Sequence, residues 1–378
     1  MRRVYGIVAI YVLLAACSDA GEESAAPVLE TGVRMLGSEG GDGFAHATEP
    51  RAFVFPGDHG SHPEYRTEWW YFTGNLATPA GRHFGFELTF FRYALAPAGS
   101  AREGESAWRA EQVWMAHFAI TDTAGGRFIA RERLTREALD LAGAVADPLR
   151  IWVKDWSASG TSGPDSLTLR LEARDDAIAL DLQLASTVPH VAQGDRGLDA
   201  KGGGDGNASY YYSVPRLAAE GLVTVEGETF AVTGSAWLDR EWSTSSLEPG
   251  TAGWDWFALH LSDGSSLMFY RLRTENGAAT PYSSGSLVRR DGTLIALAAS
   301  DVALTELDYW TSGATGVRYP ISWRLEAPKL DITLDVRPYL EQQELDLSVR
   351  YWEGAVHAEG EGPSGKLTGQ GYLELAGY

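Results

Sequence analysis

The fold class is decided by a short stretch, Leu167-Thr168-Leu169-Arg170-Leu171-Glu172, in which apolar and polar residues alternate. Side chains on a β-strand point alternately to opposite faces, so this period of two predicts a strand with one buried face. The same alternation recurs in residues 178–184, 330–336 and 345–351. Helical periodicity is almost absent, and we expect one short helix near Arg131–Leu141. Many short strands with few helices predict a mainly β protein.

A weak internal repeat predicts two similar units. Trp69-Trp70-Tyr71-Phe72 opens a hairpin whose second strand ends at Phe91-Arg92, and Trp254-Asp255-Trp256-Phe257 opens another that ends at Tyr270-Arg271. We expect Trp69 to superpose on Trp254 and Arg92 on Arg271. Two β-barrels side by side are the simplest explanation, and convergent hairpin composition is the alternative.

The start of the chain predicts export and a lipid anchor. Met1-Arg2-Arg3 is basic, and the apolar run Val4–Leu14 that follows is shorter than the roughly 20 residues that a membrane span needs, so it is typical of a signal peptide. The run ends in Leu14-Ala15-Ala16-Cys17, a lipobox whose cysteine is the only one in the chain. Two acyl chains on Cys17 would anchor the protein stably. Ser18 favours the outer membrane, and an ordinary signal peptide with an incidental cysteine is the alternative.

Composition sets the expected organisation of the remaining chain. Residues 1–17 are the predicted signal peptide, and residues 18–48 are rich in Gly, Ala, Ser and Glu, which is typical of a flexible tether. We expect an N-terminal domain over residues 49–244 and a C-terminal domain over residues 245–378. The formal net charge of −20 argues against nucleic acid as a partner, because phosphates need a basic face.

The residues best suited to chemistry lie in Gly234–Ser243. If this segment is a strand, Trp237, Asp239 and Glu241 share one face, and Leu238, Arg240 and Trp242 share the other. Burial in an aromatic pocket raises the pKa of a carboxyl, which then keeps its proton and serves as a general acid. We therefore take Asp239 and Glu241 as catalytic candidates. The alternative is that they pair with Arg66, Arg240 or Arg271 at a seam between the domains.

Other kinds of chemistry find less support in the sequence. Asp58, His59 and His62 are suitable metal ligands, but their spacing in a loop sets no geometry, so we expect no metal site and no cofactor. Arg66 and Glu68 are expected to form an ion pair, because they share a face of an extended segment. No G-x-S-x-G or H-E-x-x-H motif occurs, which argues against serine hydrolase and zinc protease chemistry.

Several long motifs carry a resemblance to a known family. They are Glu68–Leu76, Gly206–Ser213, Ala236-Trp237-x-Asp239-x-Glu241-Trp242 and Gly369–Leu375. From about Arg51 to Tyr378 the chain resembles the AttH/carotenoid 1,2-hydratase-like family, especially its secreted branch described as predicted hydrolases. The resemblance implies two lipocalin-like β-barrels side by side with a pocket near their junction. It also implies hydration of an alkene that is protonated first.

Mapped onto this chain, the resemblance makes Asp239 and Glu241 the acid candidates. Trp237 and Trp242 would be walls that stabilise a carbocation, since tryptophan faces attract cations. The further candidates for ligand binding are aromatic residues of the same motifs and of the internal repeat: Trp69, Tyr71, Tyr211, Trp254 and Trp256.

Three functions remain open from the sequence. The first expectation is a lipid-anchored protein that binds an apolar small molecule, such as a lipid, terpenoid or polyene, near the domain junction. The second is an acid-catalysed hydratase or isomerase of an unsaturated substrate. The third is a structural envelope or attachment factor. Fold alone does not choose between them.

Overall fold

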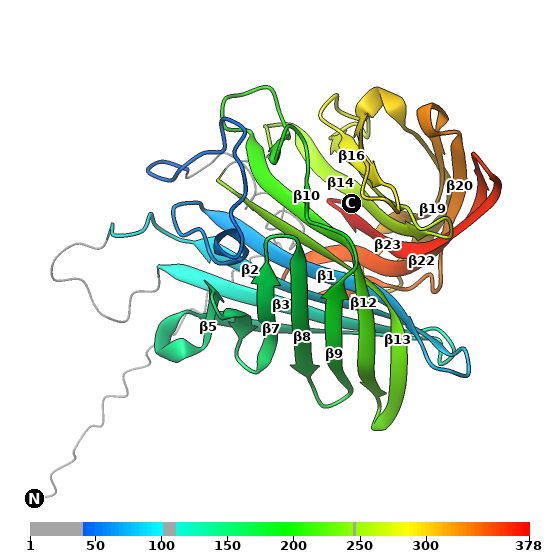
Figure 1. Ribbon diagram of the computed structural model, residues 1–378, viewed down its shortest axis with the longest axis horizontal. Helices are drawn as coiled ribbons and strands as arrows, with labels where there is room; N and C mark the ends of the chain where they lie inside the picture. Colours follow the sequence, from blue (N-terminus) through cyan, green and yellow to red (C-terminus); the bar gives the residue numbers. More distant parts are fainter. Residues whose placement is uncertain (1–40, 101–110, 245–246) are drawn as a thin grey trace, which may run out of the picture.

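The computed structural model describes residues 41–100, 111–244 and 247–378, so the predictions about Cys17 and most of the tether lie outside it. Two curled, barrel-like sheets lie side by side, which confirms the expected mainly β fold (Figure 1). In the described ranges, helical structure is limited to four short 3-10 turns: η1 (Gly57–His59), η2 (Ala138–Asp140), η3 (Ala299–Asp301) and η4 (Pro328–Leu330). No helix in these ranges is long and apolar enough to span a membrane.

The first sheet has 13 strands in the order β4-β3-β2-β1-β13-β12-β9-β8-β7-β6-β5, with β10 and β11 paired to β12. Every pairing in it is antiparallel. Its strands are β1 (Thr67–Ala77), β2 (His83–Ala94), β3 (Gln112–Asp122), β4 (Arg127–Arg136), β5 (Ala142–Ala146), β6 (Leu149–Val153), β7 (Trp156–Gly163), β8 (Ser166–Arg174), β9 (Ile178–Ser186), β10 (Val191–Ala192), β11 (Leu198–Ala200), β12 (Ala208–Val225) and β13 (Glu228–Ser243).

The second sheet has 10 strands in the order β17-β16-β15-β14-β23-β22-β20-β19-β18, with β21 paired to β22. Its strands are β14 (Thr251–Leu261), β15 (Ser266–Thr274), β16 (Ser284–Val288), β17 (Leu294–Ala298), β18 (Ala303–Thr311), β19 (Arg318–Ala327), β20 (Ile332–Pro338), β21 (Glu344–Asp346), β22 (Arg350–Gly362) and β23 (Gly365–Ala376). The boundary between the two expected domains stays a prediction.

Two local expectations are wrong. The short helix expected near Arg131–Leu141 is instead strand β4 followed by η2. Pairing of β4 with β3 continues to Arg136, and Leu139 and Asp140 then take positive φ values of 60° and 57°, which a right-handed helix does not allow. Tertiary pairing thus overrides a local pattern that could also suit a helix.

Both sheets contain the expected opening hairpin. When Arg92 is matched to Arg271, however, Trp69 does not match Trp254, and the expected equivalence is wrong by two positions. In β1–β2, Arg92 lies opposite Glu68, the residue before Trp69. In β14–β15, Arg271 lies opposite Asp255, the residue after Trp254. The shared feature is therefore an acid–arginine pair across each hairpin, and in its register Trp69 corresponds to Trp256 and Trp70 to Phe257.

Each barrel has its own apolar core, and a third apolar cluster joins the two. Trp70, Leu238 and Trp242 lie in the first core, and Phe257 and Trp323 lie in the second. The third cluster comes from the outer faces of both sheets and includes Tyr71, Tyr211, Trp237, Trp256, Met268 and Tyr372. The residues inside each sheet and those at the junction therefore alternate along the same strands.

The sheets meet where β1 and β2 face β23 and β22. A Cβ atom on Gly85 would lie 2.5 Å from the Cβ atom of Ala355 and 2.9 Å from the Tyr372 hydroxyl. A side chain at position 85 would force the barrels apart, so this glycine allows the outer faces to meet. The junction is thus a close packing surface.

Candidate functional site

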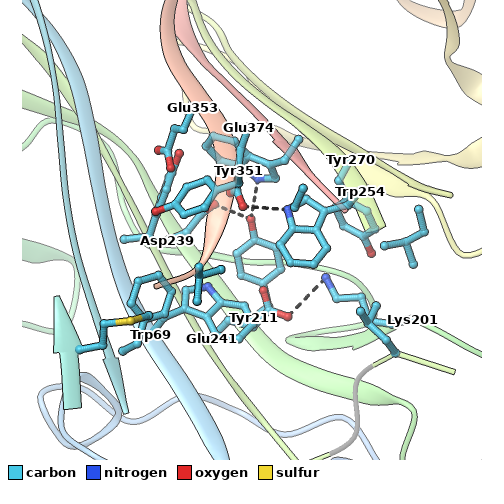
Figure 2. Close-up of a pocket in the computed structure, with 18 of the residues that line it drawn as sticks. Trp69, Lys201, Tyr211, Asp239, Glu241, Trp254, Tyr270, Tyr351, Glu353 and Glu374 are labelled. Carbon is cyan, nitrogen blue, oxygen red and sulfur yellow. Dashed lines mark hydrogen bonds and ion pairs between the residues drawn. The ribbon is translucent and has the colours of Figure 1, made fainter. Parts of the chain in front are cut away.

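A cavity of about 130 Å³ lies at the junction, between the outer faces of the two sheets (Figure 2). Its walls are mostly aromatic and aliphatic, and four carboxyl groups and one amine interrupt them: Asp239, Glu241, Glu353, Glu374 and Lys201. Lipocalins hold a ligand inside one barrel. Here apolar side chains fill both interiors, and the cavity lies outside both barrels.

Asp239 presents a carboxyl to this cavity without a cationic partner among the described residues. It is 3% exposed and lies on β13, opposite Tyr71 of β1 and Ser213 of β12. Three groups donate hydrogen bonds to it: the Tyr211 hydroxyl to Oδ2 at 2.6 Å, the Ser213 hydroxyl to Oδ1 at 2.5 Å, and the Trp237 indole Nε1 to Oδ1 at 2.7 Å. Burial outweighs these donors and raises the pKa of Asp239 to about 7. This carboxyl can therefore carry a proton at neutral pH.

Glu241, two residues along the same face, is held differently. Its Oε1 lies 3.3 Å from Nζ of Lys201, which also lies 2.8 Å from Oδ2 of Asp199. Burial raises the pKa of Glu241, and Lys201 opposes that rise. Burial opposes the charge of Lys201, but Asp199 and Glu241 raise its pKa well above the ordinary value. Lys201 is therefore positive, and it favours the ionised form of Glu241, which makes Asp239 the better proton donor.

The alternative that the two carboxyls pair with arginine at the seam is not supported at Arg240 or Arg271. Arg240 faces the first core and pairs with Glu68, and Arg271 pairs with Asp255 and Glu306. Glu68 pairs with Arg92, Arg240 and His62, so the expected pair with Arg66 is wrong. Strand register explains this, because Arg92 lies directly opposite Glu68 on β2.

The second sheet contributes two carboxyls that the sequence reasoning missed. Glu353 of β22 lies directly opposite Glu374 of β23, and Trp254 donates its indole hydrogen to Glu374 at 3.0 Å. Burial raises the pKa of Glu374 to about 8, and burial with nearby Glu87 and Glu374 raises the pKa of Glu353 well above its ordinary value. Glu374 could have been found from the sequence because it lies in the family motif Gly369–Leu375. Glu353 could have been found because it continues the alternating pattern that ends at Tyr351.

The structure brings most of the predicted ligand-binding residues together. Trp69, Tyr71, Tyr211, Trp254 and Trp256 line the cavity. Trp237 is buried beside it and reaches it through its hydrogen bond to Asp239. The expectation that Trp242 is a cavity wall is wrong, because strand alternation points it into the first core, where its ring stacks on His62 at 4.0 Å.

The polar loop before β1 lies around that same core. Asp58 pairs with Arg51 and with Nε2 of His62, the latter at 3.0 Å. His59 contacts the Tyr212 hydroxyl at 2.5 Å and the Ser162 hydroxyl at 2.8 Å. Within the described ranges, no group of three or more His, Cys, Asp or Glu side chains has the arrangement of a metal site. Asp58 and His62 thus pair with each other, and His59 bonds to side chains of the first sheet.

Comparison with known proteins finds relatives of this chain. A family model described as AttH-like matches residues 46–378. The crystal structure of a protein provisionally assigned as AttH, from Nitrosomonas europaea, is 34% identical with a TM-score of 0.78, and the match covers 89% of this chain and 100% of that one. Kievitone hydratase from Nectria haematococca shares the fold at 16% identity, with a TM-score of 0.66 over 88% of this chain and 98% of that one.

One curated relative adds a reaction name. Dehydratase asqC from Emericella nidulans is 23% identical over 190 residues, which are 49% of this chain and 53% of that protein. The chain thus spans about half the length of this relative.

Proposed function

The chain belongs to the AttH-like family, and from that premise we propose that it is an acid-catalysed hydratase or dehydratase of an unsaturated small molecule, with Asp239 as the proton donor. The observation that carries the proposal is a buried carboxyl with a pKa raised to about 7 that faces an aromatic cavity without a cationic partner among the described residues. The names of kievitone hydratase and dehydratase asqC support the reaction type. Hydration and dehydration are one equilibrium, so the two names agree.

The proposed reaction begins with proton transfer from the Asp239 carboxyl to one carbon of a carbon–carbon double bond. The other carbon becomes a carbocation, and the faces of Trp69, Trp254 and Trp256 around the cavity would stabilise it. The oxygen of a water molecule then forms a bond to that carbon. The added water then loses one of its two protons to the Asp239 carboxylate, which restores the acid, and keeps the other as the hydroxyl of the alcohol product.

Three donors around Asp239 suit this role. Once the proton has left, the carboxylate carries a negative charge in a buried site. Tyr211, Ser213 and Trp237 then donate hydrogen bonds to that charge, and such bonds are stronger than those between neutral groups. The site would therefore stabilise charge that develops during the reaction.

The first expectation from the sequence, binding of an apolar molecule without turnover, would use the same cavity. The two functions differ in whether a bound molecule gains water. A test is to incubate the purified protein with a panel of small isoprenoids, including myrcene, geraniol and linalool, in water labelled with oxygen-18. We expect at least one compound to gain one labelled hydroxyl group in mass spectrometry. Tight binding of several compounds without any labelled product would contradict the hydratase proposal and favour a carrier.

A separate proposal concerns the start of the chain, where the sequence Leu14-Ala15-Ala16-Cys17 supports lipidation of Cys17. We expect Cys17→Ala to abolish incorporation of a clickable fatty acid and to shift the protein from the membrane to the soluble fraction, because stable anchoring needs the acyl chains. Fractionation of cells that express each form measures this. The matched control is the Cys17→Ala protein expressed without residues 1–16. Its melting temperature should equal that of the wild-type protein without residues 1–16. Unchanged membrane association of the full-length variant would defeat the anchoring proposal.

A further inference from the structure

We infer that Glu353 and the Tyr71 hydroxyl form a recognition site for a hydroxyl group of the ligand, so that the cavity takes an unsaturated alcohol in preference to a pure hydrocarbon. The inference deepens the proposed function and rests on it only in treating this ligand as the substrate. It is carried by polar atoms at the cavity that the protein itself leaves without partners.

Glu353 is the carboxyl of the cavity whose two oxygens both lack a hydrogen-bond partner in the described structure. It is 1% exposed, so solvent does not satisfy it. The Tyr71 hydroxyl of the facing sheet is also buried without a hydrogen bond. It lies near enough to Glu353 to lower its pKa, but the geometry of a hydrogen bond between the two is not met. Tyr71 and Glu353 therefore interact without an ideal hydrogen bond, and at least one carboxyl oxygen of Glu353 has no partner among the described residues.

Among the neighbouring described carboxyls, Glu353 is the one with neither oxygen hydrogen-bonded, whereas Glu87 and Glu241 each leave one oxygen without a partner. Glu374, directly across the ladder, accepts a hydrogen bond from the Trp254 indole. Glu87 accepts hydrogen bonds from Thr89 at 2.8 Å and Tyr351 at 3.2 Å. A buried polar group without a partner is energetically costly, and folded proteins rarely keep one. A molecule that enters the cavity and pairs with Glu353 would remove that cost.

The chemistry of these atoms selects the kind of group that fits. Burial raises the pKa of Glu353 and favours its neutral form, which offers one O–H donor and one acceptor oxygen. The Tyr71 hydroxyl also donates and accepts. A hydroxyl group of a ligand complements both, because it too donates one hydrogen bond and accepts others. A hydrocarbon would leave Glu353 without a hydrogen-bond partner of good geometry.

The position of this recognition site suits the reaction. Tyr71 lies directly opposite Asp239 on the neighbouring strand, and such cross-strand neighbours on one face have Cβ atoms about 4.5–5.5 Å apart. In Figure 2, Glu353 lies on the side of the cavity away from Lys201. A hydroxyl held by Tyr71 and Glu353 would thus place a double bond of the same small molecule within reach of Asp239.

The test compares myrcene with geraniol, a hydrocarbon and an alcohol with similar branched ten-carbon skeletons. Quenching of tryptophan fluorescence gives Kd for each probe, since Trp69, Trp254 and Trp256 line the cavity. We expect the ratio of the myrcene Kd to the geraniol Kd to fall at least tenfold in Glu353→Leu. The ratio should stay within threefold of wild type in Glu353→Gln, whose amide also donates and accepts. Comparing ratios between variants cancels the different water solubilities of the probes.

Two further variants keep the test decisive. Tyr71→Phe should lower the ratio severalfold, and it replaces Glu353→Leu if the latter does not fold. Asp239→Asn should leave the ratio unchanged, so failure of this inference and failure of the hydratase proposal give different results. An unchanged ratio in both Glu353→Leu and Tyr71→Phe would overturn the inference. So would tighter binding of geranylamine than of geraniol to the wild type, or no binding of geraniol at all.

Discussion

Asp239→Asn is expected to lower the hydration rate by about 10²–10⁴-fold, the usual contribution of a positioned general acid. Asparagine keeps the size of the side chain and an oxygen that accepts hydrogen bonds from Ser213 and Trp237, but it has no proton to give to an alkene. The measurement is kcat on the compound that shows turnover in labelled water. Because kcat reports the chemical step, the loss should appear there and not only in KM.

The pH dependence should carry the signature of the same group. The protonated form of Asp239 is the active one, and burial raises its pKa to about 7. Activity should therefore be full below about pH 6, half at about pH 7, and about tenfold lower for each further pH unit above it. In Asp239→Asn, the residual activity should lose this fall at alkaline pH. A wild-type rate that rises with pH would indicate a base in place of an acid.

Glu374→Gln is the matched control for Asp239→Asn. Glu374 lines the same cavity and its pKa is raised to about 8, so it also holds a proton at neutral pH. We place the donor at Asp239, because the ring of hydrogen-bond donors around it stabilises the carboxylate that the reaction leaves. Glu374→Gln should therefore keep the rate within a few-fold. If it loses the rate and Asp239→Asn keeps it, the donor belongs to the second barrel and our assignment is wrong.

Glu68→Gln is expected to lower the free energy of unfolding by about 3–5 kcal/mol, the usual cost of removing one partner from a buried ion pair. Glu68 is fully buried between the guanidinium groups of Arg92 and Arg240, which are also fully buried. Its two oxygens also accept hydrogen bonds from the backbone N–H of His62, each at 3.1 Å. The substitution would leave two positive charges in the first barrel without their shared carboxylate.

Urea unfolding of the wild type and of Glu68→Gln measures this loss. The exposed pair Arg324–Asp335 supplies the control, because Asp335→Asn should cost less than about 1 kcal/mol. Burial alone would raise the pKa of Glu68, but Arg92 and Arg240 hold it well below its ordinary value. The contribution of Glu68 is therefore present above its pKa in the unfolded chain and is lost only as pH falls towards the lowered value. Equal losses for the two variants would contradict this account.

The face of each strand could be predicted from the sequence, but its partner across the junction could not. Alternation along β13 was enough to put Asp239 and Glu241 on one face with Trp237, and Arg240 on the other. Glu353 lies more than a hundred residues further on, and nothing local states that the outer face of β22 packs beside that of β1 and β2. The expected pair of Glu68 with Arg66 failed for the same reason, since its true partners come from β2 and β13.

For Trp242, the family motif predicted the wrong position and the two-residue alternation of a strand predicted the right one. The family motif placed it beside Trp237 and Asp239 as a wall of the site, whereas its odd spacing from both already assigned it to the opposite face. The structure follows the spacing. In a β protein, the parity of a residue number within a strand therefore says more about participation in a site than closeness in a motif does.

Because the cavity lies outside both barrels, alternate residues of the same strands serve different purposes. Those that face inward stabilise the fold, and those that face outward form the site. On β13, Leu238, Arg240 and Trp242 face the first core, while Trp237, Asp239 and Glu241 face the junction. Evolution can thus exchange a cavity residue such as Trp69 or Leu272 without removing an atom from either core. Substrate range can therefore change among related sequences while the apolar core inside each barrel is kept. Substitutions at Trp237 and Glu241 of β13 would chiefly change ligand binding, and substitutions at Leu238, Arg240 and Trp242 would chiefly lower stability.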